Sequence, residues 1–322
     1  MVSIGYFLSC EEHGPRELVR QARRAQDAGF ERLWISDHYH PWNDEQGESP
    51  FVWSVIGALS EATTLPVTTG VTCPTVRIHP AVIAQAAATA AVQLEGRFVL
   101  GVGSGEALNE HILGDPWPSA PRRLEMLEEA VEVIRKLHTG EDVEHRGKHY
   151  TVENARIYTL PDEPVPIYVS AFGPKAATLA GRIGDGLCST MPDESLVNKF
   201  HETGGHGKPT QAGFKVCYAP TADEGVETAH RLWPNEHLPG ELAQVLPTPR
   251  HFEQASTLVT KEMVAQAPLP VGPDPEPYVK AVREYADAGY DEVYVQQIGP
   301  LQDEFFEFWV REVAPQIDGR AR

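Results

Sequence analysis

Basic residues are scarce in this chain of 322 residues, which has 27 Lys and Arg against 46 Asp and Glu. The formal net charge of −19 argues against nucleic acid as a partner, because binding to a phosphate backbone needs a basic surface. An anionic small molecule needs only a few local donors or cations, so the charge does not exclude one. We therefore expect a small-molecule substrate and no nucleic acid.

Cysteine is also scarce, and long apolar runs are missing. The four cysteines, Cys10, Cys73, Cys188 and Cys217, lie far apart and form no CxxC pair, which predicts reduced core residues rather than a disulfide framework. No apolar stretch approaches the roughly 20 residues needed to cross a bilayer. The N-terminus lacks the basic segment of a signal peptide, so we expect a cytoplasmic protein without a membrane partner.

Motifs of several common enzyme classes are absent as well. There is no GxSxG elbow and no P-loop, which disfavours triad hydrolysis and nucleotide-triphosphate chemistry. The run Gly101-Val102-Gly103-Ser104-Gly105 lacks the GxGxxG spacing after a first strand, so it does not indicate a dinucleotide site. His145 and His149 have the spacing of a helical zinc pair, but Gly147 between them indicates a turn and no third ligand is near. We predict no metal site.

The sequence does contain a regular alternation of short β-branched runs and longer helical stretches. Eight strands are predicted at Ser3–Leu8, Arg32–Ser36, Pro66–Thr72, Phe98–Gly103, Ile167–Ala171, Gly186–Ser189, Phe214–Ala219 and Glu292–Gln296. Alternation of this kind implies parallel βαβ units, and eight of them favour an α/β fold of the (β/α)8 TIM-barrel type over an open sheet. We expect one domain over residues 1–322, with insertions at about 139–160 and 222–270 on the C-terminal face.

Polar and aromatic residues follow several of these strands, and the carboxyl ends of barrel strands are where active sites form. The second strand leads into Asp37 and His38, with Trp42 four residues later. His38 is the predicted general base, because a histidine at a barrel mouth can titrate near neutral pH. Asp37 is predicted to orient His38 or to accept a hydrogen bond from a cofactor, and Trp42 to wall the pocket.

Two further loops complete this predicted site. Glu106 follows the fourth strand in a glycine-rich turn, where burial would raise its pKa and let it act as an acid. The fifth strand ends in Ser170-Ala171-Phe172-Gly173-Pro174, a turn that opens a helix. The free N–H groups and the dipole of such a helix start favour a phosphate, so we predict a phosphate site here.

Three segments together resemble the F420-dependent glucose-6-phosphate dehydrogenase family, which belongs to the luciferase-like hydride transferases. They are Ser36-Asp37-His38-x-x-Pro41-Trp42, Gly70-Val71-Thr72-Cys73-Pro74-Thr75 and Gly101-Val102-Gly103-Ser104-Gly105-Glu106-Ala107-Leu108-Asn109-Glu110. The resemblance covers essentially the whole chain, through Tyr294-Val295-Gln296-Gln297-Ile298-Gly299-Pro300.

This resemblance implies a deazaflavin, coenzyme F420, across the barrel mouth. The residues implied to border its ring are Asp37, Gly70, Val71, Cys73, Glu106 and Asn109, and those implied to hold its phosphate are Ser170, Ala171 and Gly173. A non-prolyl cis peptide is implied at Gly70–Val71. In the implied mechanism, His38 takes the proton of a substrate hydroxyl while the hydride passes to the deazaflavin. Glu106 serves as an acid or stabilises charge, and Trp42 closes the pocket.

The chain departs from this family where the family grips a sugar phosphate with one Thr, two Lys and one Arg. Thr190 matches the Thr, but the cationic positions correspond to Asp193 and fall near Ala243 and Pro268. A carboxylate in place of a cation repels a phosphate. We therefore expect a small neutral alcohol or carbonyl substrate rather than glucose 6-phosphate, although Lys175 and Lys199 leave room for a phosphorylated sugar.

Two other functions remain as alternatives at this point. One is an FMN-dependent luciferase-like monooxygenase on the same barrel, and the other is a carrier that binds F420 without turnover. The carrier is disfavoured because it would leave His38 and Trp42 without a role. By analogy with the family, which tends to dimerise through barrel helices, we expect a homodimer.

Overall fold

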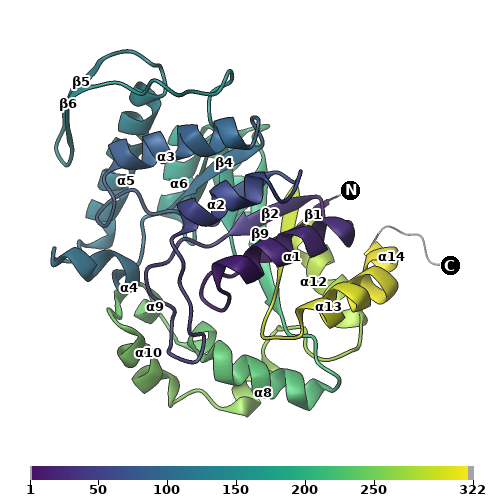
Figure 1. Cartoon of the computed structure of the whole chain (residues 1–322). Helices are drawn as coiled ribbons and strands as arrows, with labels where there is room; N and C mark the ends of the chain where they lie inside the picture. Colours follow the sequence, from purple (N-terminus) through teal and green to yellow (C-terminus); the bar gives the residue numbers. More distant parts are fainter. Residues whose placement is uncertain (1, 318–322) are drawn as a thin grey trace.

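The computed structural model describes residues 2–317, and at its centre lies a closed barrel of eight parallel strands (Figure 1). The barrel strands are β1 (Ser3–Leu8), β2 (Arg32–Ile35), β3 (Val67–Thr69), β4 (Phe98–Val102), β7 (Ile167–Ser170), β8 (Gly186–Ser189), β9 (Thr210–Val216) and β10 (Glu292–Gln297). They follow one another around the barrel in chain order, and β10 closes it against β1. The predicted (β/α)8 barrel is confirmed.

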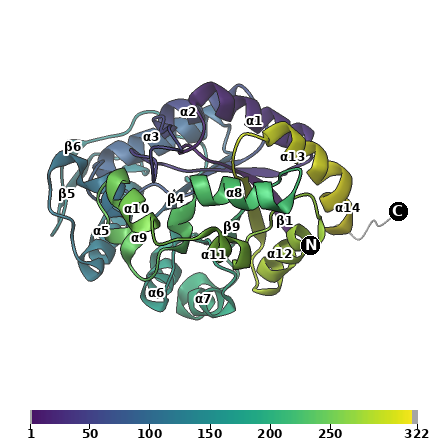
Figure 2. The same cartoon turned by 90° about the horizontal axis from the view of Figure 1, so that it is seen from below.

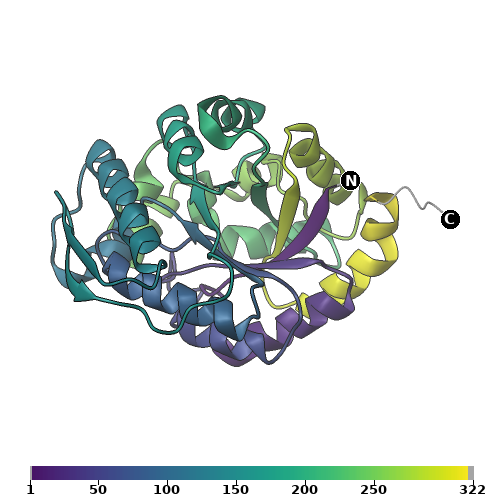
Figure 3. The same ribbon diagram turned by 90° about the horizontal axis from the view of Figure 1, so that it is seen from above.

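Helices follow the strands and cover the outside of the barrel (Figure 3). The main ones are α1 (Pro15–Asp27), α2 (Val52–Ser60), α3 (Pro80–Gln93), α5 (Ala120–Leu137), α6 (Pro174–Ile183), α7 (Glu194–Phe200), α12 (Glu276–Asp287) and α13 (Gln302–Phe308). Helix α1 begins and ends at residues that favour helix termini. Pro15 occupies its first position, and Gly29 follows its end with a φ of 84°. Its buried residues recur with helical spacing, which turns one apolar face toward the strands.

The seventh barrel strand lies earlier in the chain than its predicted position, over Thr210–Val216 instead of Phe214–Ala219. Gln211 and Gly213 gave this stretch the composition of a loop, yet both serve the barrel interior. Gln211 accepts a hydrogen bond from the indole of Trp34 at 2.8 Å, and a Cβ at Gly213 would lie 2.8 Å from the same ring. The strand therefore carries a glycine because the Trp34 side chain fills the space beside it.

Trp34 is the centre of the packed barrel interior beneath the mouth. Its ring stacks on Tyr294 with centroids 4.6 Å apart and meets the edge of Phe7 at 5.5 Å. A Cβ on Gly70 would lie 3.1 Å from the same indole, so a second glycine also makes room for it. The barrel is therefore filled by side chains and has no through channel at this level.

The long insertion at 222–270 forms helices α8 (Ala222–Leu232), α9 (Leu242–Val245), α10 (Pro249–Ser256) and α11 (Lys261–Gln266). It follows β9, so it starts from the carboxyl ends of the strands, and Figure 2 shows these helices lying across that end of the barrel. The insertion has a small apolar core of its own, which includes Trp233, Val259 and Val264. Trp42 packs against this core.

The short insertion at 139–160 forms a hairpin of β5 (Val143–Arg146) and β6 (Thr151–Ala155). The prediction that it lies on the C-terminal face is wrong, because it follows the end of helix α5 and so begins at the amino ends of the strands. Figure 1 shows the hairpin and helices α8 to α10 at opposite ends of the molecule. Its tip runs back along α5, and the Tyr150 hydroxyl donates to the Thr75 carbonyl at 2.9 Å. The hairpin thus braces the loop after β3 from outside.

Helices long and apolar enough to cross a membrane are absent from residues 2–317.

We expect Gly213→Ala to lower the free energy of unfolding by about 1–3 kcal/mol, because the new methyl group overpacks the barrel against Trp34. Urea unfolding followed by tryptophan fluorescence measures this change. The matched control is Gly57→Ala on α2, where the nearest atom would lie at 3.6 Å and where alanine favours the helix by up to about 1 kcal/mol. Equal stability of the two variants would contradict the packing argument.

Candidate functional site

His38 is the centre of the polar cluster at the carboxyl ends of the strands, where its side chain is 11% exposed. Its Nε2 atom lies 3.4 Å from an oxygen of Glu11, which follows β1, and 3.6 Å from an oxygen of Glu106, which follows β4. Three loops that are distant in the chain therefore meet at one imidazole.

The tautomer of His38 follows from its other nitrogen. Nδ1 lies 3.1 Å from the carbonyl oxygen of His40, and a carbonyl group only accepts hydrogen bonds. Nδ1 therefore carries a hydrogen, and Nε2 is the ring nitrogen that remains for proton transfer. In this state Nε2 can take up a proton, and the resulting cation is stabilised by the carboxylates of Glu11 and Glu106.

Glu11 is a member of the site that sequence reasoning missed. It is buried, and one of its oxygens accepts from the hydroxyl groups of Ser9 at 3.0 Å and Ser36 at 2.6 Å. Burial raises the pKa of the Glu11 carboxyl, but the positive charge that His38 has when protonated and the Ser36 hydrogen bond outweigh it and hold this pKa below the usual value. Its position directly after a barrel strand was the available signal, since the same rule identified Asp37 and His38.

Asn109 joins the His38 loop to Glu106. It belongs to the short helix α4 (Ala107–Glu110), and its amide oxygen accepts from the backbone N–H of Tyr39 at 2.8 Å and of His40 at 3.0 Å. Its amide nitrogen donates to Glu106 at 2.6 Å. Asn109 is therefore a clamp that fixes both the backbone carrying His38 and the Glu106 carboxylate facing it.

Asp37 belongs to a neighbouring charged network rather than to the immediate surroundings of His38. Its carboxylate accepts from the Thr72 hydroxyl at 2.8 Å and from the Arg77 guanidinium at 2.8 Å. Arg77 also contacts Glu110 through Nε at 3.4 Å and through its backbone N–H at 2.7 Å. The group that orients the His38 ring is the His40 carbonyl, not the Asp37 carboxylate that the sequence suggested.

Trp42 lies between His38 and the long insertion. Its ring centroid is 5.2 Å from that of His38 and 5.0 Å from that of Phe252 on α10, which it meets edge to face. Gln46 holds the same loop by accepting from the Trp42 backbone N–H and donating to the Leu232 carbonyl, each at 2.8 Å. The wall beside His38 is thus built jointly by the loop after β2 and the insertion.

A cleft of about 460 Å³ opens beside this cluster. It is lined by residues from the loops after β3, β4 and β7 and from α5, α6 and α9, among them Val71, Gly103, Ser104, Gly105, Glu106, Arg123, Ser170, Phe172, Gly173, Lys175 and Gln244. The predicted cis peptide at Gly70–Val71 is present, and Val71 lines the cleft. The volume falls in the range of ordinary small-molecule sites.

The start of helix α6 forms one end of this cleft. Gly173 caps the helix and Pro174 opens it, so the N–H groups of the first turn have no partners within the helix. Ser170 and Gly173, which were predicted to hold a phosphate, line the cleft. Ala171 differs, because it is fully buried and its N–H donates to the Cys188 carbonyl at 3.0 Å. Its backbone donor is therefore occupied by the barrel.

Cys73, which was predicted to border a cofactor ring, lies beneath the glycine-rich turn after β4. It is buried, its sulfur lies 2.9 Å from the Thr75 hydroxyl, and burial raises the pKa of its thiol well above the usual value. A Cβ on Gly105 would lie 2.5 Å from the same sulfur. Cys73 thus supports the glycine-rich turn from below as a neutral thiol.

A second, smaller cavity of about 220 Å³ lies under the long insertion. Thr190, predicted to bind substrate, lines it together with Pro268, Phe214, Tyr285 and Trp233. Lys215 also lines this cavity, although it was not predicted from the sequence. Its Nζ atom lies 3.0 Å from a carboxylate oxygen of Glu236 and 4.2 Å from the centroid of the Trp233 ring.

The other two positions named for the sugar-phosphate site lie elsewhere. Asp193 is the half-buried N-cap of α7, where it accepts from the N–H and the hydroxyl of Ser195. Ala243 lies on α9. Neither lines the cavity that contains Thr190.

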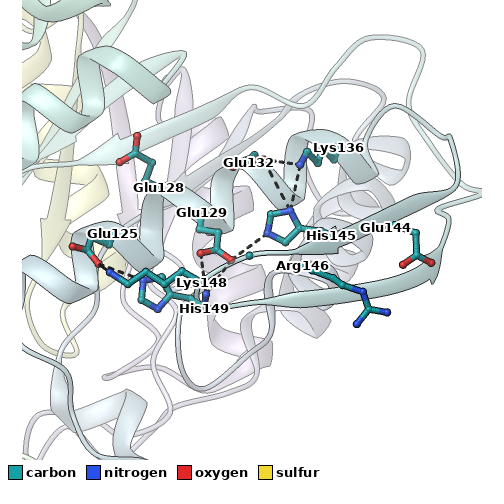
Figure 4. Close-up of a pocket in the computed structure, with 11 residues that line it drawn as sticks. Glu125, Glu128, Glu129, Glu132, Lys136, Glu144, His145, Arg146, Lys148 and His149 are labelled. Carbon is teal, nitrogen blue, oxygen red and sulfur yellow. Dashed lines mark hydrogen bonds and ion pairs between the residues drawn. The ribbon is translucent and has the colours of Figure 1, made fainter.

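His145 and His149 lie in a pocket between the hairpin and α5, and neither lines the cleft beside His38 (Figure 4). They contact different carboxylates, His145 that of Glu129 at 3.1 Å and His149 that of Glu125 at 3.5 Å. Glu129 also accepts the backbone N–H groups of His149 and Tyr150. These pairs fix the hairpin tip on the helix.

The sequence is similar to that of a known protein family and to those of several named proteins. The pattern of the luciferase-like monooxygenase family matches residues 3–292. The chain is 35% identical over 329 residues to a protein of Microbacterium testaceum named F420-dependent glucose-6-phosphate dehydrogenase, covering 98% of this chain and 97% of that one. A protein of the same name from Kribbella flavida is 36% identical, with 98% of each chain covered.

Solved structures agree in fold. An F420-dependent secondary alcohol dehydrogenase, determined with an F420-acetone adduct, matches with a TM-score of 0.88 and 31% identity over 98% of this chain and 99% of that one. The F420-dependent tetrahydromethanopterin reductase of Methanopyrus kandleri matches with a TM-score of 0.76 at 22% identity, which shows a shared fold.

We expect Arg77→Met to destabilise the protein by about 3–5 kcal/mol at pH 8, because it leaves the buried carboxylates of Asp37 and Glu110 without their cation. Burial raises the pKa of Glu110 to about 7, above its usual 4.5. Between pH 4.5 and about 7 the folded state therefore binds more protons at Glu110 than the unfolded state does. The stability that Glu110 contributes consequently falls as the pH rises through this range.

Protonation of Glu110 relieves its need for Arg77, so the loss in the variant should shrink when unfolding is measured at pH 5. The matched control is Arg146→Met, which removes an exposed pair with Glu153 and should change stability by less than about 1 kcal/mol at either pH. A loss for Arg77→Met that does not depend on pH would contradict the electrostatic explanation.

Proposed function

The chain belongs to the luciferase-like monooxygenase family, and we propose that within this family it interconverts a small neutral alcohol and its carbonyl compound with coenzyme F420. The observation that carries this proposal is the His38 site. Its Nε2 atom lies within 3.6 Å of two carboxylates, which would stabilise a proton taken up there, beside the cleft that contains Val71 and Glu106. This is the geometry of a proton acceptor next to a cofactor site.

The cofactor is F420, which is named in the curated relatives and in the structural neighbour at 31% identity. When bound, the deazaflavin accepts or releases a hydride. The cleft fits it, because Val71 and Glu106 offer a surface for a flat ring and the unpaired N–H groups at the start of α6 suit a phosphate. Ser170 and Gly173 would hold that phosphate, and Asn109 would fix Glu106 against the ring.

The proton of the substrate hydroxyl goes to His38. The His40 carbonyl keeps the hydrogen on Nδ1, so Nε2 is free to act as the base. Glu11 stabilises the imidazolium that forms, because its carboxylate is buried and lies 3.4 Å away. Glu106, which is 27% exposed, lies 3.6 Å from the same nitrogen, and Trp42 keeps water from the other side of the imidazole.

A neutral substrate is favoured by the charge of the cavity that contains Thr190. Lys215 is the one cation among its lining residues, and Glu236 in the same lining neutralises it at 3.0 Å. The remaining surface is largely aromatic, with Phe214, Trp233 and Tyr285. A cavity of this kind accepts a small apolar group more readily than a doubly charged phosphate.

We also propose a homodimer that works in the cytoplasm. What supports the dimer is an apolar groove of about 290 Å³ along α2 and α3, where the side chains of Phe51 and Val82 are each 56% exposed. Sedimentation equilibrium of the protein and of Val82→Glu tests it, because a dimer through this groove should dissociate in the variant.

Anaerobic titration with F420, followed by the visible absorbance of the deazaflavin, tests the activity. We expect bleaching when a neutral secondary alcohol is added and none with glucose 6-phosphate. Bleaching by glucose 6-phosphate alone would replace the neutral substrate with a sugar phosphate. Binding of FMN instead of F420, with consumption of oxygen, would assign the protein to the monooxygenases.

We expect His38→Ala to lower turnover at least about 100-fold, because it removes the proton acceptor. Fluorescence titration should show that the variant still binds F420. His206→Ala, which removes an exposed histidine outside the site, is the control and should keep full turnover. Unchanged turnover in the His38 variant would exclude this residue as the base.

A further inference from the structure

Arg123 is a buried cation without an anionic partner. It lies in the first turn of α5, and its residue is only 4% exposed. Among residues 2–317, no carboxylate lies within 4 Å of its guanidinium. Burial of an unpaired charge is costly, so a buried arginine is normally paired with a carboxylate or with a bound anion.

The contacts that Arg123 does make are all with neutral groups. Its two terminal nitrogens donate to the Pro118 carbonyl at 2.8 Å and to the Gln244 amide oxygen at 3.0 Å, and the guanidinium lies 4.6 Å above the Trp117 ring. Its Nε–H is buried and has no acceptor within the protein. Arg77, in contrast, is similarly enclosed and contacts two carboxylates.

Arg123 lines the same cleft as Lys175 and the start of α6. Lys175 is exposed and forms no ion pair among the described residues. The cleft therefore combines a buried guanidinium with a free donor, a second cation and unpaired helix N–H groups. All of these features favour negative charge, and an arginine fork matches the oxygens of a phosphate or a carboxylate.

We propose that Arg123, assisted by Lys175, binds an anionic group on the tail of the deazaflavin cofactor, either its phosphate or one of its glutamate carboxylates. This inference rests on the proposed use of F420. The substrate is the less suitable source of the anion, because the cavity with Thr190 shares no lining residue with the cleft that contains Arg123.

The test compares the Kd values of F420 and of the tail-free deazaflavin, which lacks both phosphate and glutamates, by fluorescence titration. We expect Arg123→Met to raise the Kd of F420 by about ten- to a hundredfold and to leave the Kd of the tail-free compound unchanged. Arg122→Met is the matched control, because it removes the same charge from the exposed neighbouring position and should change neither Kd.

A second variant does not depend on removing a buried side chain. Gln244→Glu places a carboxylate where the Gln244 oxygen already accepts from Arg123, so it supplies the missing counter-ion from within the protein. It should raise the Kd of F420 without changing that of the tail-free deazaflavin. A cofactor form with the phosphate but no glutamates identifies the group bound, because its Kd rises in Arg123→Met only if the phosphate is the ligand.

The results that overturn the inference differ from those that overturn the proposed function. If the unmodified protein binds neither F420 nor the tail-free deazaflavin, the proposed function is wrong. If it binds both compounds equally tightly, or if Arg123→Met weakens both to the same extent, the function stands and Arg123 does not recognise the tail. An unchanged Kd of F420 in Arg123→Met and Gln244→Glu overturns the inference as well.

Discussion

Burial of negative charge at one end of the barrel is the constraint on which the rest of the site depends. The carboxylates of Glu11, Asp37 and Glu110 are removed from water, and each is compensated by a cation or by hydroxyl groups. Because these partners come from loops after different strands, satisfying the charges also fixes the loops relative to one another. This network also fixes His38. Asn109 binds the backbone of the His38 loop at His40, and Glu11 lies 3.4 Å from the His38 ring.

The barrel interior supplies the rigid floor that such a network needs. Trp34 occupies the centre, and glycines at positions 70 and 213 leave the space that its ring requires. Loops that rise from a close-packed floor keep their polar groups at constant distances, which is what hydride and proton transfer demand of a site. The hairpin contributes from outside, where Tyr150 fixes the loop after β3.

Periodicity and strand-end residues predicted the barrel and the grouping of His38, Trp42 and Glu106, because both follow from local pattern and from the geometry of βα units. The start of β9 was missed because Gly213 is explained only by a tryptophan that lies 179 positions away in the chain. Arg77, Lys215 and Arg123 were missed for a related reason. A charged residue in the sequence does not reveal whether it will be buried or which partner it will meet.

The long insertion packs around an apolar core separate from that of the barrel, and it is joined to the catalytic loops mainly through Trp42, Gln46 and Trp233. The two parts of the molecule can therefore change at different rates during evolution. Mutations inside the insertion can reshape the cavity that contains Thr190, whereas the larger cleft is lined by barrel loops and by helices α5 and α6, with Gln244 as its lining residue from the insertion. A barrel of this kind can therefore acquire new substrates through changes confined to the insertion that covers it.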